Sequence, residues 1–282
     1  MRRLWILLEM IKIQHTVFAL PFAFMGALMG ARGLPSGRQA FFILLAMVGA
    51  RSAAMAFNRL ADHEFDARNP RTRDRALPAG LISRRAAWLF TLASAALFIF
   101  AAGQLNRLCL WLSFPALGVI LFYSYTKRFT AYSHLFLGAA LGLAPVAGWL
   151  AVTGSLALTP LVLGVSVTFW VAGFDVLYAL QDEDFDRQVG LYSLPVKVGR
   201  VRAMRLAQVF HALAALGFVA TGLLAGLGRL YLAAALLAGA FLLWEHRLLS
   251  PHDLSRLHHA FFTLNGLVGL ILCGATFFSL WP

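Results

Sequence analysis

Most of the acidic residues in this chain gather in two short segments. The chain has 282 residues, of which only 12 are Asp or Glu. Four of these acids lie within 62–74 and five lie within 175–186. Carboxylates crowded in this way repel one another unless a cation lies between them. Mg²⁺ prefers such hard oxygen ligands and takes further ligands from phosphates and water, so the two segments predict a magnesium site.

Basic residues stand beside the acidic segments. Guanidinium and ammonium groups bind phosphate oxygens directly. The cations placed to do so are Arg68, Arg71, Arg75, Lys127 and Arg128. Carboxylates that hold magnesium next to a ring of cations indicate a diphosphate site. The net charge of +12 is also compatible with nucleic acid, but the arginines flank apolar segments. We therefore expect anionic membrane lipid and phosphate-bearing substrates as partners, and no nucleic acid.

The elements that carry these residues are apolar enough to lie in a membrane. Hydrophobic residues make up 60% of the chain and charged residues 13%, and a helix that crosses a bilayer needs about 20 apolar residues. We expect an all-α membrane protein with about nine transmembrane helices in a single domain, 1–282. The spans are expected near 13–31, 39–58, 86–106, 108–126, 130–151, 157–180, 206–228, 230–245 and 258–280. A diphosphate site in such a protein indicates a lipid substrate, such as an isoprenyl diphosphate.

Helical spacing gives each acidic segment a direction. Asn58, Asp62 and Asp66 are four residues apart and share one helix face, and Arg51 lies on the same stripe. The stripe of the second segment consists of Asp175, Tyr178, Asp182 and Asp186. Ionisable groups at membrane depth are costly and usually point into a cavity. We expect the two stripes to face each other across a pocket that opens near one membrane surface.

The basic residues predict the orientation in the membrane. With the N-terminus inside, 19 of the 24 Lys and Arg residues fall on the inner side, as the positive-inside rule expects for the cytoplasmic side. Glu9 and Lys12 interrupt the N-terminal apolar run, which is untypical of a cleaved signal or transit peptide. We expect a protein integral to a bacterial inner membrane, with its N-terminus and its site on the cytoplasmic face.

The two acidic segments resemble each other beyond their acids. DHEFDAR begins at Asp62 and DEDFDR at Asp182, and each is followed by Leu-Pro and then by a glycine, Gly80 or Gly199. The lag is near 120 residues, or four spans, so the chain returns to the same side of the membrane. This indicates a parallel repeat, with two four-helix halves around a central cavity plus one extra helix.

The chain resembles the UbiA superfamily of intramembrane prenyltransferases over nearly its full length. The two acidic motifs of the family, N-x-x-x-D-x-x-x-D and D-x-x-x-D, are met by Asn58, Asp62, Asp66, Asp182 and Asp186. Its Y-x-x-x-K-R segment and the basic positions after the first motif are met by Tyr123, Lys127, Arg128, Arg71 and Arg75. The segments HTVFALPFA (15–23) and NPRTRDRALPAG (69–80) are similar to those of 4-hydroxybenzoate polyprenyltransferases. The resemblance extends to a branch that serves menaquinone synthesis. Ala76 stands where many members have proline.

The resemblance implies Mg²⁺-dependent transfer of a polyprenyl group from a polyprenyl diphosphate to a small aromatic acid, by electrophilic aromatic substitution. The expected catalytic residues are Asp62, Asp66, Asp182 and Asp186, which together with Asn58 would bind the metal. The expected diphosphate-binding residues are Arg68, Arg71, Arg75, Tyr123, Lys127 and Arg128. The expected residues for the aromatic substrate are Arg51, Asp175 and Tyr178, with Arg51 pairing with the carboxylate of the acceptor. The apolar spans would keep water from the allylic cation.

Other interpretations of individual residues stay open. Arg51 could be a structural arginine bonded to backbone carbonyls, and Lys127 and Arg128 could be positive-inside anchors. Two more acids, Glu245 and Asp253, are expected at the membrane interface, as are most of the histidines, which show no ligand spacing. The acids that could equally support the site or lie on the surface are Glu64, Asp74, Glu183 and Asp184.

Two rival classes use similar residues. An ion-coupled transporter also carries acids within the membrane, but such proteins often have inverted repeats, whereas this repeat is parallel and its acids cluster at one face. CDP-alcohol phosphotransferases carry D-x-x-D-G, which this chain lacks. Among acceptors, 4-hydroxybenzoate is predicted, and a naphthoate in menaquinone synthesis is the alternative.

Overall fold

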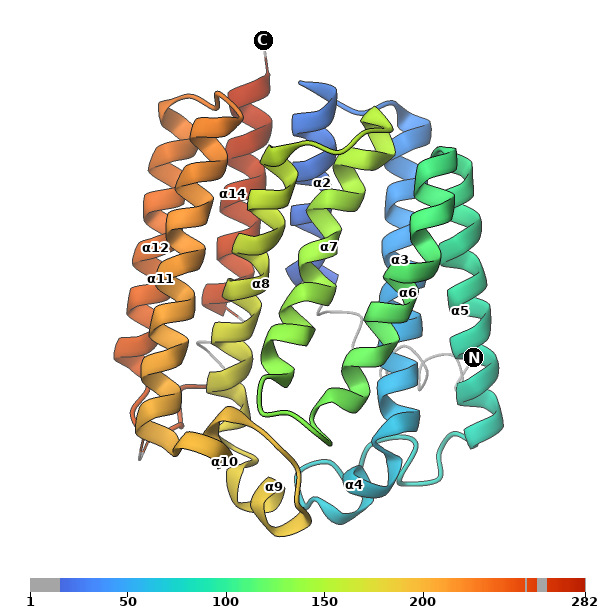
Figure 1. Ribbon diagram of the computed structural model, residues 1–282, viewed down its shortest axis with the longest axis vertical. Helices are drawn as coiled ribbons and strands as arrows, with labels where there is room; N and C mark the ends of the chain where they lie inside the picture. The colour runs from blue at the N-terminus through green and yellow to red at the C-terminus, as the bar shows by residue number, and fades with distance from the viewer. Residues whose placement is uncertain (1–15, 252, 258–262, 282) are drawn as a thin grey trace.

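The computed structural model describes residues 16–251, 253–257 and 263–281. The described residues form twelve α-helices (Figure 1). The long helices are α2 (Thr16–Ala31), α3 (Gly37–Ala61), α5 (Arg84–Leu105), α6 (Arg107–Thr126), α7 (Ser133–Thr153), α8 (Leu158–Ala179), α11 (Arg200–Leu224), α12 (Arg229–Leu248) and α14 (Asn265–Leu280). The short ones are α4 (His63–Arg68), α9 (Glu183–Val189) and α10 (Leu194–Val198). The predicted starts of the first and last spans, at 13 and 258, lie outside the described residues, as do Glu9 and Lys12.

The long helices stand at the positions predicted for the nine spans, so the prediction of an all-α membrane protein is confirmed. Within the described residues, six helices are long and apolar enough to cross a bilayer: α3, α5, α6, α7, α8 and α11. The described parts of α2 and α14 are apolar but shorter. The remaining long helix, α12, has 20 residues and carries Glu245 and Arg247 in its last turn.

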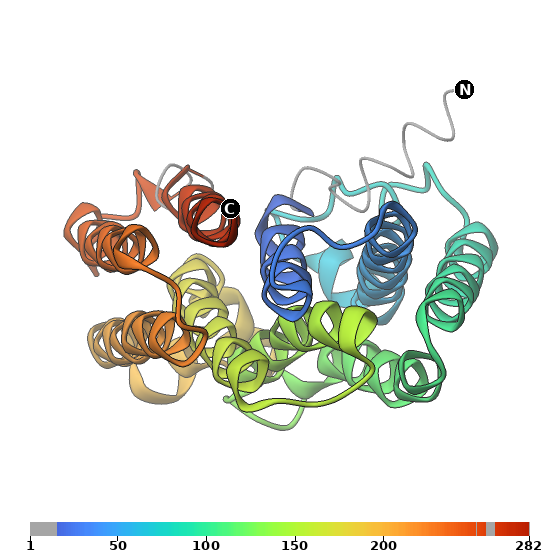
Figure 2. The same cartoon turned by 90° about the horizontal axis from the view of Figure 1, so that it is seen from above.

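The bundle is arranged around α2 and α7, which pack against each other (Figure 2). Helices α3, α5 and α6 lie on one side of this pair, and α8, α11, α12 and α14 lie on the other. Two glycines let α2 and α7 approach closely, because a side chain at Gly26 would overlap the backbone of Pro145 and one at Gly148 would overlap that of Ala23. Small residues of this kind allow helices to pack by backbone contact inside a membrane.

Local signals explain where several helices begin and end. Ser36 and Gln39 form a capping box at the start of α3, and the Asn106 side chain accepts a hydrogen bond from the Cys109 amide at the start of α6. Gly154 ends α7 in the left-handed region at φ +67°, which a residue without a Cβ adopts at little cost. These ends fix where the chain turns between spans.

Each acidic segment breaks a long helix in the same way. Asp62 follows α3 and precedes α4 with φ −94° and ψ 4°, and Asp182 precedes α9 with φ −101° and ψ 2°. Farther along, Gly80 and Gly199 both have positive φ, at +71° and +79°. Asp62 and Asp182 therefore share one backbone conformation, which supports the predicted parallel repeat, and both segments lie at the same end of the bundle (Figure 1).

The second half contains a buried polar cluster that the sequence analysis interpreted wrongly. Glu245 was expected at the membrane interface, but its exposure is 1%. The Asn265 amide donates to Glu245 Oε1 at 2.9 Å, and the Trp170 indole donates to Asn265 Oδ1 at 2.7 Å. The expectation for the histidines fails at His134 and His211, which are also buried. A buried polar group is stable only where it finds partners, and these partners come from helices far away in the sequence.

Candidate active site

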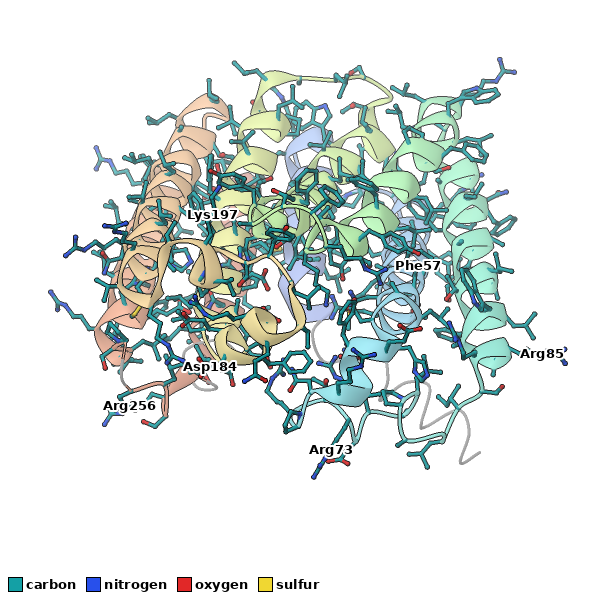
Figure 3. The ribbon with its side chains drawn as sticks, turned by 60° about the horizontal axis from the view of Figure 1, so that its bottom comes forward. Phe57, Arg73, Arg85, Asp184, Lys197 and Arg256 are labelled. Carbon is teal, nitrogen blue, oxygen red and sulfur yellow. The ribbon has the colours of Figure 1, made fainter. Side chains whose placement is uncertain are left out.

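The two acidic segments lie next to each other at one end of the bundle (Figure 3). They are joined by a bidentate ion pair, in which Arg71 donates through Nε to Asp182 Oδ1 at 2.9 Å and through Nη2 to Oδ2 at 2.5 Å. The Asn69 amide donates to the same Oδ1 at 3.1 Å. Asn69 and Arg71 are thus in direct contact with a residue 113 and 111 positions away. Arg71, which is predicted to bind the diphosphate, touches Asp182, which is predicted to bind the metal.

Asp62 lies at the centre of the first segment and is buried. Lys127 Nζ donates to its Oδ2 at 2.7 Å, and the Asn58 amide donates to the same oxygen at 3.1 Å. Burial raises the pKa of Asp62, and the charge of Lys127 opposes that shift. The other carboxylate oxygen, Oδ1, is buried and has no hydrogen-bond partner among the described residues. The lone pairs of this oxygen are therefore available to coordinate a metal ion.

Asp66, one turn farther on, is held by arginines of its own half. Arg75 Nη1 donates to Oδ1 at 2.7 Å and to Oδ2 at 2.9 Å. The guanidinium of Arg59, which is buried, lies 3.9 Å from Oδ2. Two positive groups therefore face one buried carboxylate.

The remaining predicted cations differ in what they contact. Arg128 donates through Nη2 to the carbonyl oxygen of Ala61 and stacks over Phe65 and Tyr125, so it holds the end of α3. Arg68 is exposed at the end of α4, and within the described chain no hydrogen bond or ion pair joins it to the site. Among the described residues, Arg71, Arg75 and Lys127 therefore pair directly with the site carboxylates, whereas Arg68 and Arg128 do not.

The second segment is less tightly held than the first. Asp182 keeps 18% of its side chain exposed, against 5% for Asp62. Burial, followed by the negative charge of Asp182, raises the pKa of Asp186 to about 6. Tyr178, on the same stripe, receives a long hydrogen bond of 3.5 Å from Arg71 Nη1 to its hydroxyl.

The four acids whose role the sequence left undecided differ in their burial. Glu64, Asp74 and Asp184 are exposed. Glu183 is buried and accepts hydrogen bonds from Arg187 at 2.9 Å and from Arg200 at 2.7 Å. Since Arg200 begins α11, this carboxylate ties α9 to the next long helix and is structural.

The predicted residues for the aromatic substrate lie deeper in the bundle. Arg51 is in the middle of α3, and its Nε is buried with no hydrogen-bond partner among the described residues. Asp175, in α8, is in contact with His134 of α7 at 2.7 Å. Tyr123 lies one turn before the end of α6. Arg51, Tyr123 and Asp175 each lie within a long helix, before the ends at which the acidic segments begin, and these three residues are called the deeper layer.

The residues fit a divalent cation in their chemistry. Within the described ranges, no group of three His, Cys, Asp or Glu side chains is close enough to hold a metal ion. Three of the carboxylates are instead each paired with a cation, Asp62 with Lys127, Asp182 with Arg71 and Asp66 with Arg75. The partnerless Oδ1 of Asp62 is a hard oxygen donor, which suits Mg²⁺.

Sequence reasoning missed several residues of this region. Asn69, Arg59, Ser124 and His134 all contact predicted site residues. Asn69 directly follows the first motif and precedes Pro70, which marks a turn but not a bond to Asp182. The only sign in the sequence that Arg59 belongs to the site is its position next to Asn58. Nothing in the local sequence connects His134 with Asp175, 41 residues away.

Two apolar pockets lie away from these residues. One, of about 310 Å³, is lined by residues of α2 and α14 and by the α2–α3 connection, among them Phe24, Leu34 and Phe277. The other, of about 370 Å³, lies between α8 and α11. Neither is lined by a residue of the predicted site, so the site is identified by its side-chain contacts.

Three known proteins are similar to this chain over most of its length. The 4-hydroxybenzoate octaprenyltransferase of Vibrio atlanticus (strain LGP32) is 29% identical over 254 residues, which cover 90% of this chain and 89% of the relative. The solved structure of a UbiA homolog from Aeropyrum pernix K1 is 34% identical with a TM-score of 0.85, covering 93% of this chain and 97% of that one. A UbiA homolog from Archaeoglobus fulgidus bound to GPP and Mg²⁺ shares the fold, with a TM-score of 0.76, 22% identity and coverage of 98% and 99%.

The family model for the UbiA prenyltransferase family matches residues 19–267. This range includes both acidic segments and all the long helices except the first residues of α2 and most of α14. The chain belongs to the UbiA prenyltransferase family.

Proposed function

We propose that this enzyme transfers a polyprenyl group from a polyprenyl diphosphate to 4-hydroxybenzoate, in a magnesium-dependent reaction of quinone biosynthesis. The observation that carries the proposal is the contact of Arg71 with Asp182 across 111 residues. It brings carboxylates and phosphate-binding cations from both halves of the chain to one place. A transporter that couples ions through acids has no need for the bidentate arginine, and membership in a prenyltransferase family favours the enzyme.

The metal and the diphosphate would share the first layer of side chains. Mg²⁺, when bound, would neutralise negative charge on the diphosphate oxygens. The residues proposed to hold it are Asn58, Asp62, Asp66, Asp182 and Asp186. The residues proposed to bind the diphosphate are Arg68, Arg71, Arg75, Tyr123, Lys127 and Arg128. Cations already placed beside the carboxylates stabilise the charge that develops as the C–O bond breaks, without reorganisation at that moment.

The acceptor would lie in the deeper layer. Arg51 supports this proposal, because its buried Nε has no hydrogen-bond partner among the described residues and a guanidinium pairs well with a planar carboxylate. Asp175 and Tyr178 would border the same ring. The octaprenyltransferase of Vibrio atlanticus is named for 4-hydroxybenzoate, which makes it the first acceptor to test. A naphthoate carries a similar carboxylate and is the second.

The membrane environment completes the proposal. The apolar spans would exclude water from the allylic cation. The Archaeoglobus fulgidus homolog was solved with GPP and Mg²⁺, so geranyl diphosphate is a suitable short probe. By the excess of Lys and Arg at the end that carries the acids, we place this end on the cytoplasmic side of a bacterial inner membrane.

One experiment tests the function directly. The full chain, purified in detergent, is incubated with geranyl diphosphate and either 4-hydroxybenzoate or 1,4-dihydroxy-2-naphthoate, with Mg²⁺ or with a chelator. We expect Mg²⁺-dependent prenylation of 4-hydroxybenzoate. Asp62→Asn should abolish it, whereas Glu64→Gln, which alters an exposed acid two residues away, should not. Prenylation of the naphthoate alone would replace the acceptor, and prenylation of neither ring would overturn the proposed function.

A further inference from the structure

His134 and Asp175 form a pair that the magnesium and diphosphate residues do not explain. His134 Nδ1 and Asp175 Oδ2 are 2.7 Å apart. His134 is the second residue of α7 and Asp175 is near the end of α8, so the pair joins two spans. The histidine side chain is 4% exposed, whereas that of Asp175 is 28% exposed. The carboxylate therefore has one side held by the protein and another side accessible.

The backbone fixes the protonation of this histidine. The amide of Leu194 donates to His134 Nε2 at 3.3 Å. Leu194 is the first residue of α10, and the first amides of a helix lack partners within the helix. An Nε2 that accepts a hydrogen bond carries no proton, so the neutral ring carries its proton on Nδ1 and donates it to Asp175. Both ring nitrogens are occupied, and His134 cannot itself take a proton from a substrate.

Asp175 differs from Asp62, Asp66 and Asp182 in its partner. Those three are each bonded to a Lys or Arg side chain and are proposed to hold the metal. The hydrogen-bond donor of Asp175 is a histidine, and 28% of the Asp175 side chain is exposed. Asp175 therefore has a carboxylate side that can contact the substituted ring.

Its depth matches the position where the ring would react. Asp175 lies four residues, or about one turn, before the end of α8, whereas Asp182 lies beyond that end, at the start of α9. A prenyl diphosphate whose phosphates lie between Asp62 and Asp182 would direct its first carbon towards Asp175. The aromatic ring that bonds to this carbon would lie beside the accessible carboxylate oxygen.

We propose that Asp175 accepts the proton released from the substituted ring carbon and that His134 is its positioning residue. The inference rests on the proposed function. The C–O bond of the prenyl diphosphate breaks, and its electron pair leaves with the diphosphate. The first prenyl carbon bonds to the ring carbon beside the hydroxyl, using a ring electron pair. The proton on that ring carbon then passes to Asp175, and the C–H bonding pair restores the aromatic ring. Asp175 afterwards gives the proton to water, so no other reactant is consumed.

Three variants separate this role from a structural one. Asp175→Asn removes the proton acceptor but keeps an oxygen that can accept from His134 Nδ1. His134→Asn places its amide nitrogen where Nδ1 was and keeps the donor to Asp175. His134→Gln reaches the level of Nε2, so it keeps an acceptor for the Leu194 amide and loses the bond to Asp175. Each histidine variant thus keeps one of the two contacts of His134 and loses the other.

The measurement is the rate of prenylation of 4-hydroxybenzoate and of the same compound deuterated at both carbons beside its hydroxyl. Wild type should show no isotope effect, because breaking the C–O bond is slower than losing the ring proton. Asp175→Asn should be about 100-fold slower, the typical contribution of a positioned base, with a primary isotope effect. His134→Gln should show the same effect at a smaller loss of rate, and His134→Asn, which keeps a donor to Asp175, should recover most of the rate that His134→Gln loses.

The outcomes distinguish this inference from the function on which it rests. A wild-type enzyme that prenylates neither ring overturns the proposed function and this inference with it. A wild type that prenylates 4-hydroxybenzoate, with an Asp175→Asn variant that is equally fast or slow without an isotope effect, overturns only the role of Asp175. If His134→Gln does not fold, Asp175→Asn still decides the inference, because it preserves the hydrogen bond to His134.

Discussion

The two acidic segments begin with the same backbone conformation but have different partners. Asp62 and Asp182 both stand between a long helix and a short one with nearly equal φ and ψ. Asp62 is held by Lys127 and Asn58, which belong to the first half of the chain. Asp182 is held by Arg71 and Asn69, which also belong to the first half. The acid of the first segment therefore takes its partners from its own half of the chain, whereas the acid of the second segment takes its partners from the first segment.

This difference shows that a sequence repeat can determine a local backbone conformation but not the partners of the side chains. The repeated sequence gives both segments the same turn, because backbone conformation depends on neighbouring residues. The partners are set by which helices lie alongside, and these are not repeated. We expect changes in the first segment to affect both segments, and changes in the second to stay local.

Among changes to the contacts between the two halves, the largest effect is expected from the carboxylate that receives partners from the other half. Asp182→Asn weakens the charge-assisted bonds with Arg71 and removes a proposed metal ligand, so prenylation should fall by about 100-fold or more. Asp184→Asn is the matched control, because this acid is 86% exposed in the same segment. Rates with geranyl diphosphate at saturating Mg²⁺ would measure both. Equal rates for the two variants would break the comparison.

Arg71→Ala tests the dependence of the second segment on the first. It removes the bidentate pair with Asp182 and a proposed phosphate ligand, so KM for the prenyl diphosphate should rise by about 10-fold. Arg71→Lys should restore only part of this, since lysine cannot form the two parallel bonds. Arg73→Ala changes an exposed arginine that points away from the bundle (Figure 3) and should leave KM unchanged. A KM for Arg71→Ala like that of wild type would show that the two segments act independently.

Arg75→Ala should affect the folding of the first segment more than binding. It leaves the buried Asp66 with only the distant Arg59, and a buried carboxylate that loses its partner costs about 3 kcal/mol. Unfolding in mixed micelles would measure the loss. Adding Asp66→Asn should recover part of it, because the uncompensated charge is removed. A double variant as unstable as Arg75→Ala would show that packing of the arginine is what matters.

The smallest effect is expected from pH at Asp186. Its pKa is raised from 3.8 to about 6, mainly by burial. The folded state therefore holds the proton more tightly than the unfolded state. This contribution to stability is complete below about pH 4 and is lost as pH rises through 6. In the presence of a chelator, the Tm of wild type relative to Asp186→Asn should fall between pH 4.5 and pH 7. Parallel Tm curves for the two proteins would contradict the assignment.

The sequence predicted the spans and proposed the residues of the candidate site. Apolar runs of bilayer length and the spacing of Asn58, Asp62 and Asp66 are local patterns, and local patterns determine helices and their polar faces. The sequence also grouped Arg71 and Arg75 with the carboxylates by proximity. It did not predict which arginine binds which acid, since Arg75 turns back within its own segment and Arg71 crosses to the other half.

Only the tertiary structure decided the contacts between distant helices. His134, Glu245 and Asn265 carry no local signal, yet they are buried and bonded to residues 20 to 95 positions away. Hydropathy treats each of them as a polar interruption, because it counts the cost of burial and not the partner that offsets it. The partners depend on which spans pack together through small residues such as Gly26 and Gly148. By itself the sequence determined what kind of protein this is and which residues are candidates for its chemistry. The packing of the helices decided how each charged group is held.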